Sequence, residues 1–112
     1  MTWRIGVDLG GTKTEVAALD DSGEIRWRRR APTAGEYGAI VTNIGDLVRA
    51  AETELGVHAT VGVGIPGVVS PVTGLVKNAN SLVLIGHPLD KDLGAALDRE
   101  VRVENDANCF AL

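Results

Sequence analysis

Residues 5–19 read IGVDLGGTKTEVAAL, and this stretch predicts two strands joined by a glycine turn. Apolar residues alternate with glycine and aspartate over its first five positions, which is typical of a half-buried strand. Gly10-Gly11 indicates a turn, and Lys13–Leu19 reads as a second strand. A further turn at Asp20–Gly23 leads into Glu24–Arg30, where apolar and charged residues alternate again. Three strands joined by short turns predict an antiparallel meander.

The third segment of the meander is expected to be amphipathic. Its alternation places Ile25 and Trp27 on one face and its charged residues on the other. The three arginines Arg28–Arg30 are typical of a solvated edge strand, because charges at an edge oppose pairing with other chains.

A long helix is predicted after Pro32. Apolar residues recur at steps of three and four from Ile40 to Leu55, and Gly56 is the expected stop. Two positions are possible for the beginning of this helix. Thr33 has capping-box spacing to a glutamate three residues later, and a later start near Tyr37 is also possible.

The second half of the chain alternates strand and helix. Thr60–Ile65 is an apolar run of strand length, which favours a buried parallel strand. Residues 68–88 are expected to be rich in loops, with a possible short strand at Leu75-Val76. A short helix over Leu89–Leu97 and a strand over Val101–Val103 follow. A meander followed by helix–strand alternation predicts a mixed sheet with helices on its faces.

Length and composition exclude several classes of protein. The chain has 112 residues, one domain at most, and a formal net charge of −4, which argues against binding nucleic acid through overall charge. One cysteine excludes an intramolecular disulfide framework. Neither a secretory signal nor an apolar run long enough for a membrane span is found, so a cytoplasmic location is expected.

The turn after the first strand is a candidate phosphate site. In Asp8–Lys13 the two glycines leave backbone N–H groups bare, and Thr12 adds a hydroxyl; successive N–H groups form an anion-binding concavity. Asp8 could hold Mg²⁺ beside phosphate oxygens. The segment is not a Walker A loop, since that pattern is missing and a strand follows. A plain hairpin turn with a solvated aspartate is the alternative.

Three further polar segments are candidates for binding or catalysis. Gly62–Gly67 matches G-x-G-x-x-G, but it lies within and at the end of a strand with no helix opening after it, so a dinucleotide site is rejected. A ligand approaching the backbone and tight strand packing remain alternatives. Glu104–Asn108 offers Asp106 as a general base or as a helix cap. The polar cluster at Lys77–Ser81 offers uncharged amides and a hydroxyl that suit a polyol, although such residues also make turns.

Together, Asp8–Lys13, Gly64–Gly67 and Glu104–Asn108 resemble the ROK family of sugar kinases, within the actin/hexokinase/Hsp70 ATPase superfamily. Their order and spacing agree with the family across essentially the whole chain. The resemblance implies an α/β fold. The implied fold is the actin-like ATPase (ribonuclease H-like) domain, a mixed sheet with a three-strand antiparallel meander and flanking helices.

The subgroup is also suggested by resemblance. Ser70–Gly74, Val76–Ser81 and Asp90–Leu93 look most like bacterial fructokinases of the mannofructokinase type. D-fructose is therefore the expected substrate of an ATP-dependent kinase. Glucokinase or N-acetylglucosamine kinase is the alternative, since Asn105–Leu112 is shared in appearance with N-acetylglucosamine kinases.

The resemblance implies a role for each matching position. Asp106 would be the catalytic base that takes the proton from the acceptor hydroxyl of the sugar. The other implied ligands are Gly10, Gly11, Thr12 and Lys13 for ATP phosphates, Gly67, Asn80, Asn105 and Asp106 for the sugar, and Asp8 for Mg²⁺, directly or through water. ATP and Mg²⁺ are the implied cofactors. The implied partners are a hexose and, at full length, a second copy in a homodimer, with no nucleic acid or membrane.

The resemblance also implies a longer protein. Such kinases run to about 300 residues, beyond the usual size of one domain. Residues 1–112 are therefore interpreted as the N-terminal ROK/actin-like ATPase domain of a chain whose C-terminal domain is absent. The adenosine site and the zinc site of the family are expected in that missing part, so the isolated fragment is expected to be inactive. A truncated, non-catalytic sugar-binding module is the alternative.

Overall fold

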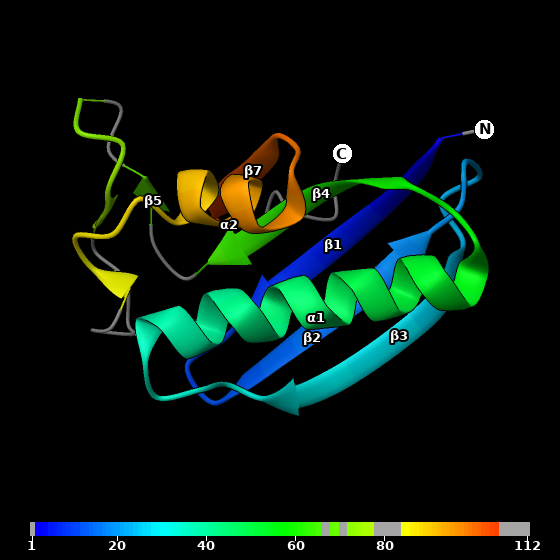
Figure 1. Cartoon of the computed structure of the whole chain (residues 1–112), viewed down its shortest axis with the longest axis horizontal. Coiled ribbons are helices and arrows are strands. Elements are labelled where there is room, and N and C mark those ends of the chain that lie inside the picture. Colours follow the sequence, from blue (N-terminus) through cyan, green and yellow to red (C-terminus); the bar gives the residue numbers. More distant parts are fainter. Residues whose placement is uncertain (1, 66–67, 70–71, 78–83, 106–112) are drawn as a thin grey trace.

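A five-stranded sheet with two helices on one face forms the body of the molecule (Figure 1). The computed structural model describes residues 2–65, 68–69, 72–77 and 84–105. The strand order is β3-β2-β1-β4-β7, and a separate pair, β5-β6, forms a two-stranded sheet. The elements are β1 (Trp3–Leu9), β2 (Lys13–Leu19), β3 (Ile25–Pro32), α1 (Tyr37–Leu55), β4 (Ala59–Ile65), β5 (Val68–Val69), β6 (Val76–Lys77), α2 (Leu89–Leu97) and β7 (Val101–Asn105).

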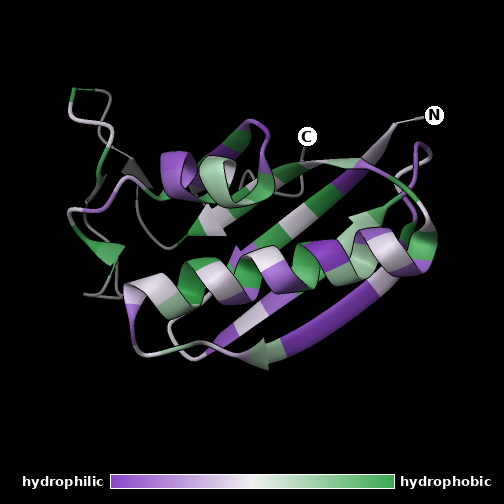
Figure 2. Ribbon diagram, in the orientation of Figure 1, coloured by the Kyte–Doolittle hydropathy of each residue, from purple (hydrophilic) through white to green (hydrophobic). Residues whose placement is uncertain are grey.

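The predicted antiparallel meander is confirmed. β1 pairs with β2 and β2 pairs with β3, both antiparallel. The β2–β3 turn is held by the carboxylate of Asp20, which accepts hydrogen bonds from Ser22 N at 2.9 Å and Ser22 Oγ at 2.6 Å. The strand β3 lies at the edge and is hydrophilic along most of its length (Figure 2).

The prediction that Ile25 shares the buried face of Trp27 is wrong. Trp27 is buried, whereas Ile25 is 43% exposed. The pairing of β2 with β3 shifts between Ala18 and Leu19, where Trp27 and Ile25 face consecutive residues of β2. Arg26 is thus an extra residue in β3, and a bulge of this kind reverses the alternation on one side of it.

The helix α1 begins at the later of the two predicted starts. Glu36 is its N-cap residue, with no hydrogen bond from its side chain, so the capping box with Thr33 does not form. The helix ends as predicted at Gly56, which adopts the left-handed conformation at φ 67°. Glycine takes this conformation without the steric cost that a Cβ atom brings.

The strands β1, β4 and β7 are parallel, and the helices bury one face of the sheet. β1 pairs in parallel with β4, and β4 in parallel with β7. The helices α1 and α2 both cover the same face of the sheet (Figure 1). The largest fully buried side chains come from both layers: Ile5, Leu9, Ile40, Ile44, Ile65, Leu84, Leu89, Leu93, Val7, Val16, Val48 and Val63.

The segment predicted to be rich in loops contains a small antiparallel pair. β6 lies one residue later than the short strand predicted at Leu75-Val76, and its partner β5 was not predicted. Two-residue strands are too short to leave a periodic signal in the sequence.

Among the described residues, no helix is long and apolar enough to cross a membrane.

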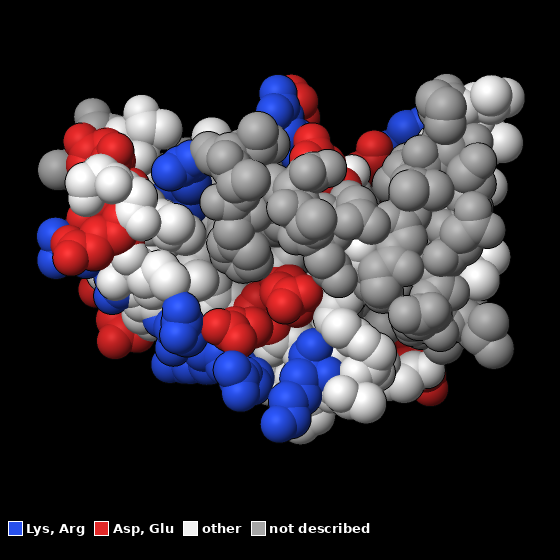
Figure 3. Space-filling model, turned by 180° about the vertical axis from the view of Figure 1, so that it is seen from behind, with Lys and Arg blue, Asp and Glu red and all other residues white. Residues whose placement is uncertain are grey.

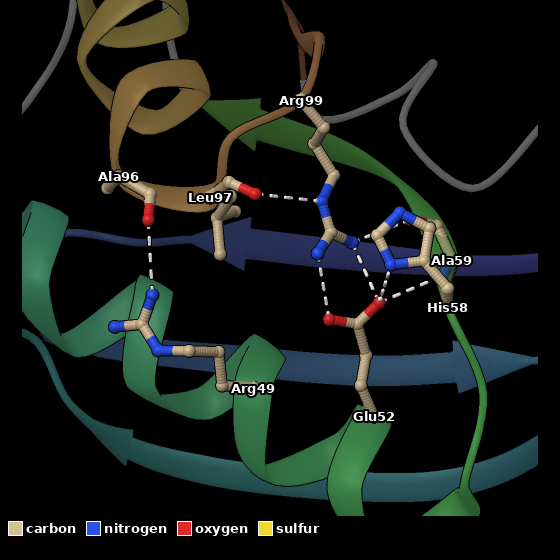
Figure 4. A network of polar contacts seen from close by, with 7 residues as sticks. All are labelled: Arg49, Glu52, His58, Ala59, Ala96, Leu97 and Arg99. Atoms are coloured by element: carbon tan, nitrogen blue, oxygen red, sulfur yellow. Dashed lines mark hydrogen bonds and ion pairs between the residues drawn. The ribbon is translucent and has the colours of Figure 1, made fainter.

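A buried ion pair joins both helices to the amino-terminal end of β4 (Figure 4). Arg99, between α2 and β7, donates from Nη1 to Glu52 Oε2 at 2.7 Å and from Nη2 to Glu52 Oε1 at 2.9 Å. Arg99 Nη1 also donates to the carbonyl of Ala59 at 2.8 Å, and the Ala59 amide donates to Glu52 Oε2 at 2.8 Å. The two side chains are 14% and 11% exposed.

Candidate functional site

Three strand ends meet at one edge of the sheet. Asp8 near the end of β1 is paired with Gly64 of β4, and Gly64 is paired in turn with Glu104 of β7. All three strands run in the same direction, so their carboxyl ends share this edge (Figure 1). Ligands of open α/β sheets bind beyond such ends. The sequence motifs that begin at Asp8 and Glu104 therefore start about 10 Å apart, two strand spacings, although about a hundred residues separate them.

The turn after β1 is tight on one side and open on the other. The Gly10 amide donates to the carbonyl of Lys13 at 3.0 Å and closes the turn. A Cβ atom at Gly10 would lie 2.8 Å from that carbonyl oxygen, so only glycine fits without movement of the backbone. At Gly11 a Cβ atom would meet no heavy atom within 4 Å. Within the described residues, the amides of Gly11 and Thr12 have no hydrogen-bond partner.

Asp8 is the carboxylate nearest in sequence to this turn. Its side chain is exposed and makes no ion pair with the described residues. Glu15 lies directly opposite Asp8 in the β1–β2 pair, and carboxylates in that arrangement repel one another. Glu15 is compensated by Arg28 Nε at 3.0 Å and Arg30 Nη2 at 3.0 Å. Asp8 therefore carries the uncompensated negative charge of the two.

The charged residues around Asp8 belong to the sheet face that the helices leave uncovered. Figure 3 shows this face, with acidic side chains bordered by basic ones. Lys13, the first residue of β2, is exposed and lies two positions before Glu15. Alternation along a strand places Lys13 on the same face as Glu15, and hence as Asp8. Thr12 is exposed as well.

Thr33 contacts the turn from the end of β3. Its Oγ1 donates to the carbonyl of Gly10 at 2.8 Å, and its amide donates to the carbonyl of Thr12 at 2.9 Å. The sequence pattern predicts only a helix cap at Thr33. The signal that could have found its position is the hairpin register, because Pro32 pairs with Lys13 and so delivers the next residue to the turn.

Four predicted site residues lie at or beyond the limits of the described chain. Asn105 is the last residue of β7, where it pairs with Ile65 of β4. Gly67, Asn80 and Asp106 lie outside the described residues. The G-x-G-x-x-G match behaves as expected: Gly62 and Gly64 are inside β4, and the next element is the strand β5 rather than a helix.

A second polar cluster, missed by sequence analysis, joins the amino-terminal ends of both helices. The Tyr37 hydroxyl donates to Asp92 Oδ2 at 2.5 Å, and the Tyr37 ring stacks on His87 with centroids 3.8 Å apart. Burial raises the pKa of Tyr37, and the hydrogen bond to the Asp92 carboxylate raises it further. This cluster fixes α1 against α2 with a phenol that stays protonated at physiological pH.

The described residues fit a phosphate group and Mg²⁺. Two backbone amides without partners among those residues lie beside an exposed threonine hydroxyl, and such donors suit phosphate oxygens. Mg²⁺ is usually held by one or two carboxylates together with substrate phosphates and water, so Asp8 beside the turn is a suitable donor.

Comparison with known proteins points to one family. The ROK family model matches residues 4–112. The N-acetyl-D-glucosamine kinase of Citrobacter koseri is 45% identical over 108 residues, which cover 96% of this chain and 36% of that enzyme. The chain thus spans about a third of the length of such relatives.

Solved structures agree in fold. A ROK family glucokinase from Streptomyces griseus, in complex with glucose and AMPPNP, is 32% identical with a TM-score of 0.82, covering 95% of this chain and 34% of that one. A ROK hexokinase from Thermus thermophilus is 29% identical with a TM-score of 0.79, covering 96% and 36%. The five-stranded mixed sheet with its meander is the actin-like ATPase fold of these kinases. The chain belongs to the ROK family.

Proposed function

We propose that the natural polypeptide carrying this chain is an ATP-dependent sugar kinase that phosphorylates a neutral hexose. One observation carries the proposal: the β1–β2 turn, with two amides that have no partner among the described residues, lies at the same end of the sheet as the carboxyl ends of β4 and β7. The kinase relatives support it, and among them the Streptomyces griseus enzyme was solved with glucose and the ATP analogue AMPPNP.

The proposed phosphate side is built from the β1–β2 turn. Gly10 keeps the turn tight, Gly11 and Thr12 offer amide donors, and Lys13 adds a positive charge on the face of Asp8. Asp8 would hold Mg²⁺, directly or through water, and the ion would neutralise charge that develops on the transferred phosphoryl group. Phosphoryl transfer depends mainly on positioning and charge neutralisation, and these residues supply both.

The proposed sugar side follows β4 and β7. Asp106, directly after Asn105, is assigned as the base that accepts the proton of the acceptor hydroxyl. Asn105 and Asn80 are assigned to the sugar hydroxyls, and Gly67 to a backbone contact. Amides without formal charge suit a neutral sugar and supply no positive charge to pair with an acidic one.

Among neutral hexoses, the proposed substrate is N-acetyl-D-glucosamine. D-fructose, expected from the subgroup resemblance, has no support among the relatives compared, whereas N-acetyl-D-glucosamine is the substrate named for the enzymes that are 44–45% identical to this chain. Residues 1–112 are proposed to form the N-terminal domain of the kinase, which would act in the cytoplasm as a homodimer.

The proposal is tested by steady-state kinetics on the natural polypeptide. ATP-dependent phosphorylation of N-acetylglucosamine, glucose, mannose and fructose is measured under one set of conditions, with the Asp106→Asn variant purified in parallel to exclude contaminating kinases. The highest kcat/KM is expected for N-acetylglucosamine. A clear preference for fructose contradicts the substrate choice and leaves the kinase intact, whereas turnover of no hexose contradicts the kinase and favours a non-catalytic sugar-binding module.

A further inference from the structure

We propose that Thr33 is a positioning residue that sets the direction of the Gly11 amide in the phosphate-binding turn. The inference rests on the proposed kinase function for its meaning, but its geometry stands on contacts between described residues. Thr33 lies 22 positions after Gly11 and outside the three motifs that carry the family resemblance.

Two carbonyl groups of the turn are held by this one residue. Thr33 Oγ1 donates to the carbonyl of Gly10 at 2.8 Å, and Thr33 N donates to the carbonyl of Thr12 at 2.9 Å. The contacts flank Gly11, the residue around which the turn is open. The side chain and the backbone of Thr33 therefore fix the turn on both sides of its exposed position.

The planarity of the peptide bond converts these contacts into a direction for the Gly11 amide. The carbonyl of Gly10 and the N–H of Gly11 belong to one trans peptide, so they point in opposite directions. Because the Gly10 carbonyl points to Thr33, the Gly11 N–H points away from β3. That amide has no hydrogen-bond partner among the described residues, so it is available to an anion.

The hydroxyl of Thr33 is itself oriented by Thr14. A threonine hydroxyl can donate one hydrogen bond, and the hydroxyl of Thr33 donates it to the Gly10 carbonyl. In the 2.9 Å contact between the two threonine Oγ1 atoms, Thr14 is therefore the donor. Thr14 is 5% exposed, which places the start of this chain of hydrogen bonds in the interior of the sheet. The Gly11 amide is thus directed by this network in addition to the Gly10–Lys13 hydrogen bond that closes the turn.

The experiment compares Thr33→Val with Thr33→Ser in the natural polypeptide. Valine keeps the shape and removes the hydroxyl, whereas serine keeps the donor. Thr33→Val is expected to raise the KM for ATP about threefold to tenfold, the usual range for one net hydrogen bond, and to leave the KM for the hexose within about twofold. Thr33→Ser is expected to keep the KM for ATP near that of the unaltered protein.

The matched control is Ser22→Ala, which removes a hydroxyl donor from the turn at the opposite end of β2. It is expected to lower the melting temperature about as much as Thr33→Val without changing the KM for ATP. A Thr33→Val variant with an unaltered KM for ATP overturns the inference, and so does an equal rise in Ser22→Ala.

A second measurement is independent of catalysis. The backbone ¹⁵N order parameter of Gly11 is expected to fall in Thr33→Val and to be kept in Thr33→Ser. An unchanged order parameter in Thr33→Val overturns the inference whether or not the protein is a kinase. Failure of the unaltered protein to phosphorylate any hexose counts against the proposed function instead, so the two failures are distinguishable.

Discussion

At the scale of single residues, two neighbouring glycines have different reasons to be glycine. Gly10 sits against the carbonyl of Lys13, where a side chain would collide with backbone, and Gly11 faces open space. Neither has a positive φ, so the difference is one of space rather than of backbone conformation. Gly10 serves the fold, and Gly11 leaves room for a ligand to reach the backbone.

The pair provides a test in which each variant is the control of the other. Gly10→Ala is expected to lower the free energy of unfolding by about 1–3 kcal/mol, because the 2.8 Å contact forces the backbone to move. Gly11→Ala is expected to change it by less than about 0.5 kcal/mol and instead to raise the KM for ATP. Urea denaturation and steady-state kinetics measure the two effects. Equal losses of stability would contradict the steric assignment of Gly10.

Asp106 provides the residue-scale test of catalysis. Asp106→Asn keeps the shape of the side chain and removes the proposed base, so kcat of the natural polypeptide is expected to fall by roughly 10²–10⁴. The affinity for the sugar, measured by calorimetry, is expected to change much less. Near-normal turnover of the variant would falsify the assignment of the base.

At the scale of elements, the ion pair of Glu52 with Arg99 joins three segments at the edge opposite the candidate site. The carboxylate accepts hydrogen bonds from Arg99 and from the first residue of β4, and His58 Nδ1 lies 3.6 Å away. Burial acts to raise the pKa of Glu52, but the hydrogen bonds from Arg99 and the Ala59 amide outweigh it and hold the pKa below its ordinary value. The charged form is therefore the one that stabilises the fold.

Glu52→Gln is expected to lower the free energy of unfolding by about 1–3 kcal/mol, since it weakens charge-assisted hydrogen bonds and leaves a largely buried arginine short of a partner. The exposed pair Arg49–Asp46 supplies the control: Asp46→Asn is expected to cost less than about 0.5 kcal/mol. Chemical denaturation of both variants at pH 7 measures the difference, and equal effects would show that burial of the Glu52 pair is unimportant.

The lowered pKa of Glu52 also predicts a dependence on pH. A carboxyl whose pKa is lower in the folded than in the unfolded state contributes stability above its unfolded pKa, near 4.5, and loses it as the pH falls towards the folded value. The stability gap between the unaltered protein and Glu52→Gln is expected to narrow below about pH 4.5. A gap that is constant from pH 7 to pH 3 would contradict the assignment.

At the scale of the whole molecule, the helices cover one face of the sheet and leave a hollow on the other. A cavity of about 460 Å³ lies on the uncovered face, lined among others by Gly6 and Gly62, which are paired in the sheet. In the part of the chain that the structure describes, the turn residues Gly11 and Thr12 and the carboxylate of Asp8 are exposed to solvent. A kinase site must surround both substrates to position them and exclude water.

The isolated 112-residue chain is therefore expected to show no ATP-dependent turnover at ordinary kinase rates of about 1–100 s⁻¹, although weak sugar binding can persist. A coupled assay of the fragment, beside the natural polypeptide at equal concentration, makes the comparison. Kinase-like rates from the fragment would show that these residues suffice for catalysis.

Local patterns in the sequence predicted most of the elements and their order. The meander, the helix ending at Gly56 and the strand before Asn105 all follow from periods of two or 3.6 residues and from glycine at turns. These signals are local, because each depends on residues only a few positions apart. They failed where an irregularity broke the period, as at the bulge that exposes Ile25, and where an element was too short to have a period, as at β5.

Which residues these elements bring close together depends on the tertiary structure. The row of Asp8, Gly64 and Glu104 depends on the register between three strands that are distant in the chain, and no local period specifies that register. The same holds for Thr33, whose spacing suggested a helix cap and whose hydroxyl instead holds a turn 23 residues earlier in the chain. Sequence patterns indicate which face of an element is apolar. The partners of its polar groups are set only when the strands pair and pack around a shared core.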